Sequence, residues 1–501
     1  MISRKVILIL LFVCLFITYS LSQYESDIFD KDLLAISLVL SSLLMFVPFI
    51  TRYDKNVKRN YFRPTIFFVL GYFIVFFQKY YDLLFGFIKK TDHIFVDVSL
   101  INRSLIISVT ALIMFYIGYF LTRYHKKKKK QQKSTLMPIY VYDTNLLHYL
   151  FWAITVLLCL LNAKNIGTGN YNQANLEKEA GGIGNYMSIL YMVVYFSLLS
   201  MTVYNCITLG CTKLKGFVKQ FGRINMLCVI IYSVLMVLIG VRSSVIVIIA
   251  SLTCSIMHIM NKRVKLWKLA IAFAIITYIV SFIGINRKAT GTDVSSQIEA
   301  VQFAMLEQKS ILPTTLELAG SLETFNYALD YVPSKHDYLY GSFHIRNLVS
   351  AIPFSSYFKS SMFDPHWKYR SSDYFITYII QGENYSYGNG SSINADLYLN
   401  YGIPGVIVGL FLLGVIFWRV ESAFCTTKSP KLFSILFFLI FVGYALPYCR
   451  SGYLTPINYI VFCYILVTIY TPHFKRRVKK FLPTNKKKIY EKINSIYPNI
   501  Q

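Results

Sequence analysis

Apolar runs long enough to cross a lipid bilayer recur along this 501-residue chain and restrict its fold more than any other feature. Each run spans about 17 to 23 residues, the length that an α-helix needs to cross roughly 30 Å of hydrocarbon. Lipid offers backbone polar groups no water, so such runs form helices with internal hydrogen bonds. The sequence therefore predicts an all-α polytopic membrane protein with about twelve transmembrane helices. The apolar stretches begin near Val6, Leu33, Thr65, Leu105, Leu146, Tyr186, Met226, Ser244, Leu269, Gly402, Leu432 and Ile457.

The basic residues lie between alternate spans and predict the orientation of the chain. Only 15% of residues are charged, whereas roughly 25% is typical of a soluble domain. About 34 Lys and Arg lie in one set of connecting segments and roughly eight in the short segments opposite, so the positive-inside rule places the first set and both termini in the cytoplasm. This placement and attraction to anionic membrane lipids explain the net charge of +27, and we expect no nucleic-acid partner. The inner segments are 1–5, 52–63, 123–133, 213–223, 262–268, 419–431 and the tail after Pro472.

The first apolar stretch resembles a signal peptide in one respect. It has a basic start, and Ser20 and Ser22 lie near its end, where a small-residue cleavage site would fall. Its apolar run is long for a signal peptide, so an uncleaved helix is the favoured interpretation.

One connection, residues 286–401, is far longer than the others and lies on the predicted outer side. Structureless loops longer than about 15 residues are uncommon unless they are functional, so we expect this loop to be partly helical. A helix capped by Thr314 or Thr315 and lying at the membrane surface is predicted by apolar residues at helical spacing. These residues are Leu318, Leu322, Phe325 and Leu329. The predicted organisation is helices one to nine in 1–285, the large extracytoplasmic loop in 286–401, helices ten to twelve in 402–471 and a basic cytoplasmic tail in 472–501.

Arginines at the outer ends of helices are the clearest anomaly, since the outer face of such a protein is depleted in them. Arg242 and Arg450 lie in short turns between spans, Arg287 follows the ninth span, and Arg346 lies in the large loop. A single arginine often reaches only a headgroup phosphate. Several on one face match a diphosphate, because each guanidinium binds phosphate oxygens in a bidentate way.

A second group of polar residues leads directly into the tenth span. Asn389 and Ser391 lie in a glycine turn, and Asp396 and Asn400 share one face of the helix that follows. Side chains of this kind hydrogen-bond to hydroxyl-rich ligands, although a loop with only a capping role explains the same pattern.

Several ionisable residues of the loop are candidates for proton transfer, and His344 is favoured because Arg346 is near it. The sequence has no His/Glu spacing of a metal site, no phosphate-binding glycine-lysine loop and no Gly-x-Ser-x-Gly elbow. The nine cysteines are scattered, so neither a disulfide framework nor a zinc site is supported and we expect no metal or other cofactor. The candidates are His336, His344, His366, Glu383 and Asp396.

Taken together, these motifs resemble the Wzy-type polymerases of O-antigen and capsular polysaccharide. The resemblance rests on the Gly-Val-Arg-Ser turn at Arg242, the 344–346 region, the stretch 390–405 and the turn that contains Arg450. It implies a GT-C-like membrane enzyme that joins undecaprenyl-diphosphate-linked oligosaccharide repeat units by inverting glycosyl transfer at the outer face of the bacterial cytoplasmic membrane. Similar polymerases usually have a glutamate where this chain has Asp396, which shortens the reach of that carboxylate.

The resemblance assigns roles to the residues already singled out. Arg242, Arg287 and Arg450 would hold diphosphate with Arg346 as a fourth, and His344 would accept the proton of the attacking sugar hydroxyl. A chain-length regulator and a flippase are the protein partners it implies. Two alternatives stay open: an O-antigen ligase that transfers the finished glycan to another acceptor, and a flippase for the same lipid-linked sugar, for which the spans carry few of the charges that transport sites require.

Overall fold

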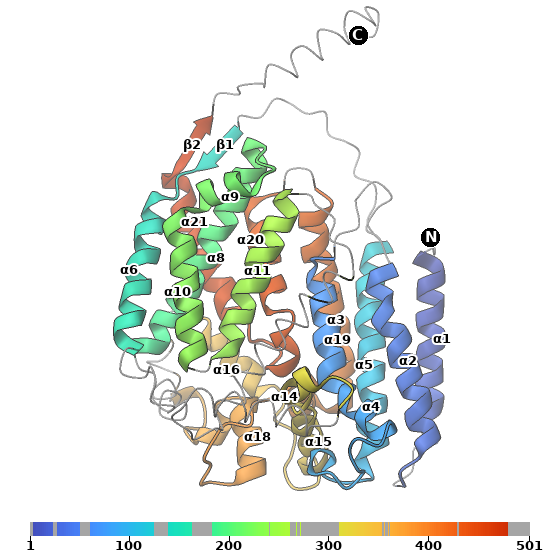
Figure 1. Cartoon of the computed structure of the whole chain (residues 1–501). Helices are drawn as coiled ribbons and strands as arrows, with labels where there is room; N and C mark the ends of the chain where they lie inside the picture. Colours follow the sequence, from blue (N-terminus) through green and yellow to red (C-terminus); the bar gives the residue numbers. More distant parts are fainter. Residues whose placement is uncertain are drawn as a thin grey trace, which may run out of the picture.

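The computed structural model is a helical bundle with a helical layer covering one end (Figure 1). A large loop supplies this layer, and the starts of α1 (Arg4–Gln23) and of the first strand lie at the opposite end (Figure 1). The structure describes residues 4–23, 28–50, 61–124, 139–162, 183–239, 241–260, 267, 271, 310–352, 355, 359, 361–427 and 430–478.

The first half of the bundle is built from apolar helices around one core. The core side chains include Phe68, Tyr72, Phe115 and Phe417, which are fully buried. The half comprises α1, α2 (Lys31–Ile50), α3 (Pro64–Phe76), α4 (Gln78–Leu84), the short helix η1 (His93–Phe95), α5 (Leu100–Tyr124) and α19 (Ile393–Cys425).

Helices α5 and α19 pack backbone to backbone because each carries a glycine at the contact. A Cβ atom at Gly118 would lie 2.1 Å from the carbonyl oxygen of Phe411, and one at Gly414 would lie 2.0 Å from that of Phe115. Small residues allow this close approach, which is a common way for helices to associate in membranes. The packing fixes α19, whose outer end carries Asp396.

The second half forms its own apolar core and includes the one two-stranded sheet of the described residues. Strand β1 (Ile139–Tyr142) pairs antiparallel with β2 (Lys475–Val478), with Ile139 opposite Val478. Arg476 also forms an ion pair with Asp143. The helices are α6 (Asn145–Asn162), α8 (Ile183–Leu209), α9 (Leu214–Phe221), α10 (Arg223–Ile239), α11 (Arg242–Met260), α20 (Leu432–Tyr444) and α21 (Ile457–His473), with η5 (Pro447–Arg450) between the last two.

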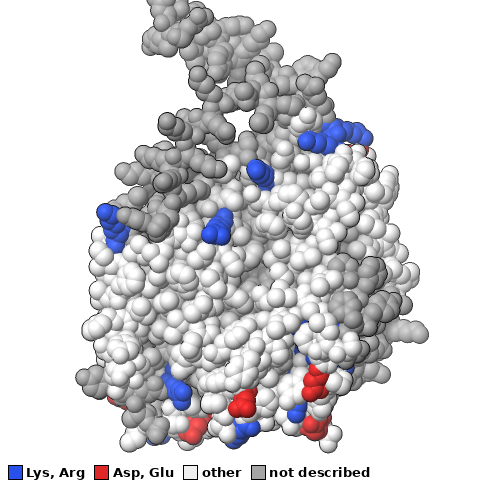
Figure 2. Space-filling view, turned by 180° about the vertical axis from the view of Figure 1, so that it is seen from behind, with Lys and Arg blue, Asp and Glu red and all other residues white. Residues whose placement is uncertain are grey.

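The fold confirms a polytopic, all-α membrane protein. Eleven of the twelve predicted spans begin in or next to a described helix, and the ninth, near Leu269, lies outside the described residues apart from 267 and 271. By length and composition, seven described helices can cross a membrane, or nine if the two bent pairs α3 with α4 and α9 with α10 each count as one. The count of twelve therefore stays a prediction. Figure 2 shows a broad uncharged belt between Lys and Arg near one end and mixed charges at the other.

The large loop is helical, as expected, but its first helix differs from the prediction. Instead of one helix from a Thr315 cap, the chain forms η3 (Pro313–Thr315), α14 (Leu316–Ala319) and α15 (Leu322–Tyr331), because it breaks at Gly320. The Thr315 hydroxyl binds Gln78 of α4 and caps no helix. Leu322 and Phe325 are fully buried in the protein core, and the expected position of this segment at the membrane surface stays a prediction. The loop continues with α16 (Ser342–Ser350), η4 (Trp367–Tyr369) and α18 (Ser372–Gln381).

Candidate active site

Two helices bring the predicted catalytic residues together. His344 lies in the first turn of α16, which is held in place by the buried side chain of Phe343. Asp396 lies in the first turn of α19, where the hydroxyl of Ser392 accepts the N–H of Ala395 and so caps the helix. Because both residues lie at the start of a helix, their backbone positions are fixed on rigid elements.

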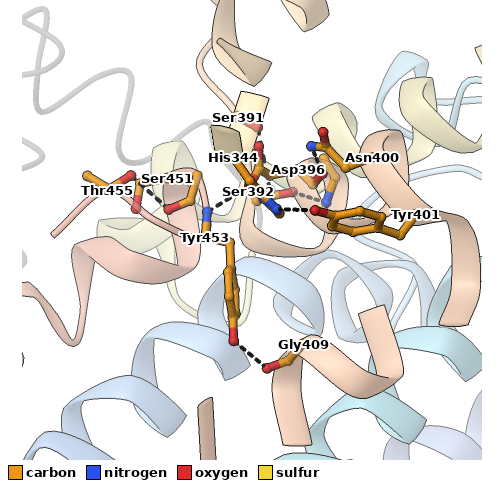
Figure 3. A network of polar contacts seen from close by, with 12 residues as sticks. His344, Ser391, Ser392, Asp396, Asn400, Tyr401, Gly409, Ser451, Tyr453 and Thr455 are labelled. Atoms are coloured by element: carbon orange, nitrogen blue, oxygen red, sulfur yellow. Dashed lines mark hydrogen bonds and ion pairs between the residues drawn. The ribbon is translucent and has the colours of Figure 1, made fainter. Parts of the chain in front are cut away.

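His344 and Asp396 form a buried hydrogen-bonded pair (Figure 3). The Nε2 atom of His344 lies 2.8 Å from Oδ2 of Asp396. The backbone N–H of Tyr453 donates to the same oxygen at 2.8 Å. Asp396 is fully buried, and its other oxygen, Oδ1, has no hydrogen-bond partner among the described residues. A buried carboxylate held in this way fixes the orientation of the imidazole.

The pair also determines which nitrogen of His344 can act as a base. A carboxylate only accepts hydrogen bonds, so Nε2 must carry the proton that lies toward Asp396. The lone pair of the neutral ring is then on Nδ1, which lies 3.2 Å from the hydroxyl oxygen of Tyr401 (Figure 3). This contact is longer than a typical O–H hydrogen bond, and Tyr401 is 45% exposed. A ligand hydroxyl can therefore replace the tyrosine hydroxyl at Nδ1.

A glycine makes room for Tyr401 at this position. Gly341 precedes α16 with a positive φ of 84°. A Cβ atom there would lie 2.4 Å from the Tyr401 hydroxyl oxygen. Tyr401 is itself followed by Gly402, whose φ of 68° bends α19 between the outer turns with Asp396 and the membrane segment. Both glycines therefore shape the surroundings of His344.

The polar residues predicted to contact glycan form bonds within the protein. The Asn400 side chain donates to the backbone carbonyl of Asp396 at 2.7 Å, and its own carbonyl oxygen is buried without a partner among the described residues. Ser391 is buried and donates to the carbonyl of Ser392 at 3.4 Å. The Asn389 side chain binds Gln381, and this bond closes the loop after α18. In these bonds, Asn389 and Ser391 hold the turn in place.

The structure describes the side chains of two of the four predicted arginines, Arg346 and Arg450. Arg346 donates to the backbone carbonyl of Tyr369 at 2.8 Å, so it braces the loop, and burial with nearby Arg370 lowers its pKa. Arg450 ends η5 and lies 3.9 Å from the carboxylate of Glu317. Arg242 is the first residue of α11, but its side chain lies outside what the structure describes, and so does all of Arg287.

Arg242 and Arg450 lie at the same end of the molecule. Helices α11 and α20 are adjacent where Gly443 meets Val247, five residues after Arg242. Arg450 follows a few residues beyond Gly443, in η5. The proximity of the two helix ends is compatible with a shared anion site, and the diphosphate role stays a prediction.

A polar cavity of about 280 Å³ lies beside the His344 and Asp396 pair. Gly452 is part of its wall, and a Cβ atom at Gly452 would lie 3.6 Å from the Asp396 carboxylate. Asn347, one turn after His344 on α16, is also in the wall. Ile189 of α8 and Tyr459 of α21 add apolar surface. The remaining polar lining residues are Ser371, Ser372, Asp373, Thr455 and Asn458.

Asp373 is the carboxylate of this cavity. It lines the cavity, and the hydroxyl of Ser371 donates to its carboxylate. The surrounding protein raises the pKa of Asp373, and the negative charge of Asp396 raises it further. This residue was not predicted from the sequence. The only local signal was the Ser-Ser-Asp run at the start of a helix, which is typical of a cap.

Three further residues around His344 were not predicted as site residues: Tyr401, Tyr453 and Asn347. Tyr453 contributes a backbone N–H, which any residue type supplies, so no sequence signal marks it. Among the other loop candidates, His366 pairs with Glu383 at 3.4 Å on the surface, and His336 binds the carbonyl of Asp337. No group of three or more His, Cys, Asp or Glu side chains suited to a metal occurs in the described part of the chain.

The fold and the site define an integral membrane protein with a buried histidine and carboxylate pair under a structured loop. A family model described as O-antigen polysaccharide polymerase Wzy matches residues 4–478, and the chain belongs to this family. It is therefore a glycosyltransferase-type polymerase that joins lipid-linked O-antigen repeat units. Comparison with curated proteins and with solved structures gave no match.

Proposed function

We propose that His344 and Asp396 form the acid/base centre with which this polymerase joins undecaprenyl-diphosphate-linked repeat units at the outer face of the cytoplasmic membrane. The observation that carries the proposal is the buried hydrogen bond between Nε2 and Oδ2, because it leaves Nδ1 as the basic atom. A positioned general base contributes roughly 10²- to 10⁴-fold to the rate.

The proposed step balances without a further reactant. The attacking hydroxyl of one repeat unit gives its proton to Nδ1 of His344, and its oxygen forms a bond to the anomeric carbon of the other unit. The bond from that carbon to the diphosphate oxygen breaks, and the diphosphate leaves with the electron pair. Because attack is opposite the leaving group, the anomeric configuration inverts. Asp396 stabilises the imidazolium that forms.

Arginines are the proposed partners of the leaving diphosphate. Arg242 and Arg450 lie at neighbouring helix ends, and Arg287 follows the predicted ninth span. Guanidinium groups stabilise a departing anion, so neither a protonating acid nor a metal is required by this chemistry. Arg346 is held by backbone carbonyls of the loop, so its proposed role is to keep that loop in place.

The arrangement of the chain supports the proposed orientation. The start of α1 and the β1 and β2 pair lie at one end of the bundle, opposite the site (Figure 1). The basic connecting segments predicted to be cytoplasmic also include residues near that end, such as Arg63 and Lys213. We infer an inner-membrane protein with cytoplasmic termini, and a flippase and a chain-length regulator as its functional partners.

Purified full-length protein supplied with the lipid-linked repeat unit alone tests this function. A polymerase needs no second kind of acceptor, so we expect products of two and more repeat units, formed equally well in the presence of a chelator such as EDTA. Product formation only after another acceptor lipid is added would indicate a ligase. Loss of activity with EDTA that added Mg²⁺ restores would refute the metal-independent step.

A further inference from the structure

The charge of the residues that line the cavity beside the catalytic pair suits a neutral sugar better than a diphosphate. None of its described lining residues is Lys or Arg, and Asp373 contributes a carboxylate. A diphosphate would meet a like charge there with no cation to offset it. A neutral ligand avoids this repulsion.

The lining groups match the hydroxyls of a sugar. Carboxylates and amides accept hydrogen bonds from hydroxyl groups, and the cavity offers Asp373 together with Asn347 and Asn458. The Oδ1 atom of Asn458 is buried and has no hydrogen-bond partner among the described residues. A buried acceptor without a partner is costly, and a rotation of the Asn458 amide toward the cavity would let a ligand hydroxyl satisfy it.

The size of the cavity restricts how much of the glycan it can hold. Its volume of about 280 Å³ lies just below the roughly 300–1,000 Å³ of sites that enclose a drug-sized ligand. One sugar ring is therefore a better match than a whole repeat unit. Tyr459 and Ile189 provide apolar surface for the C–H face of such a ring.

The two substrates of the reaction differ in a way that decides which sugar enters. The donor sugar is bonded directly to diphosphate and must stay beside the arginines. The acceptor sugar carries the attacking hydroxyl and lies away from any phosphate. We propose that this cavity binds the acceptor sugar, with Asp373 and Asn458 as specificity-determining residues, an inference that rests on the proposed transfer at His344.

Binding of the free oligosaccharide tests the proposal. The probe is the repeat-unit oligosaccharide released by mild acid from the lipid carrier of the protein's own host, titrated against full-length protein in detergent. We expect Asp373→Ala to weaken binding about 10- to 100-fold, the change that corresponds to losing a hydrogen bond to a charged group. Asn458→Leu, which preserves side-chain size, should weaken it roughly 3- to 10-fold. As a control, Asp330→Asn alters a partly exposed carboxylate of α15 that lies outside the cavity wall, and it should change nothing.

A second probe, inorganic diphosphate, separates the acceptor site from a donor site. Its affinity should be the same in wild type and in Asp373→Ala. The proposal is overturned if oligosaccharide affinity is unchanged in both cavity variants, or if diphosphate affinity falls instead.

Elongation measurements keep this inference separate from the proposed function. If the wild type elongates normally and the cavity variants bind and elongate equally well, the sugar site is refuted and the proposed function is not. If the wild type binds oligosaccharide in a manner that depends on Asp373 but forms no chains, the proposed transfer fails and the sugar site stands. With both intact, Asp373→Ala should raise KM for the lipid-linked unit more than it lowers kcat.

Discussion

Combined replacement of His344 and Asp396 is the most direct test of the catalytic pair. If the two residues act as one unit, the double variant should lose about as much activity as a single variant, and not the product of the two single losses. His344→Ala removes the proposed base. We expect the elongation rate to fall by about 10²- to 10⁴-fold, equivalent to roughly 3–5 kcal/mol of transition-state stabilisation.

Asp396→Asn should give a similar loss by a different route. With the amide oxygen at the Oδ2 position, the amide nitrogen occupies the buried Oδ1 position, which has no acceptor among the described residues. A stranded donor of this kind costs about 1–3 kcal/mol in the free energy of unfolding. With the amide reversed, its N–H₂ faces Nε2 of His344 and moves the ring proton to Nδ1, so the base is lost.

The assay is elongation of a lipid-linked repeat unit by purified variants, followed by gel separation of the products. We expect the double variant to fall within about threefold of the slower single variant. Asp337→Asn, which alters an exposed carboxylate in the same loop, is the control for charge removal. A double variant whose loss equals the product of the single losses, on the order of 10⁴-fold or more, would refute the reasoning.

Four further substitutions test other parts of the site. Arg242→Ala and Arg450→Ala should leave protein levels intact but yield single-repeat glycans in cells, and normal chain lengths in both would exclude the diphosphate role. Gly341→Ala should lower activity, because the added Cβ atom would lie 2.4 Å from the Tyr401 hydroxyl and would displace it. The positive φ of this position should also lower the free energy of unfolding by about 1 kcal/mol. Unchanged activity and melting temperature would contradict this. Asp373→Asn should raise the melting temperature at pH 7. The pKa of the Asp373 carboxyl is raised in the folded state, so the folded state loses stability as the pH rises from the ordinary pKa of 3.8 through the folded pKa. The substitution removes this loss. Melting curves at pH 4 and pH 7 check this sign, since the gain should shrink at the lower pH.

The membrane architecture was predictable because its signal is local. An apolar run such as the one that forms α5 specifies a helix by composition alone, and basic residues between runs specify orientation. The glycine turn before Asp396 likewise predicted a helix start, and both the turn at Gly390 and a helix that begins at Ile393 are present. The strand pair was missed because β2 is largely basic and gains its structure only from pairing with β1.

The candidate site was only partly predictable, since its geometry depends on contacts between distant segments. His344 and Asp396 were each identified, but 52 residues separate them and nothing local shows that they form a hydrogen bond. Arg346 was predicted as a fourth diphosphate residue, and its bond to the carbonyl of Tyr369, 23 positions away, also left no local signal. The cavity residue Asp373 was missed altogether, because a wall made by four helices and a turn leaves no pattern in any one of them.

The pairing of β1 with β2 has a consequence for the synthesis of the chain. Asp143, beside β1, and Arg476 of β2 are 333 positions apart, so β1 leaves the ribosome long before its partner exists. Its backbone donors and acceptors wait for the last spans to insert. Closing the sheet then joins the start of the second half to its final helix. The strand pair can therefore form only after the spans between β1 and β2 have been synthesised and inserted.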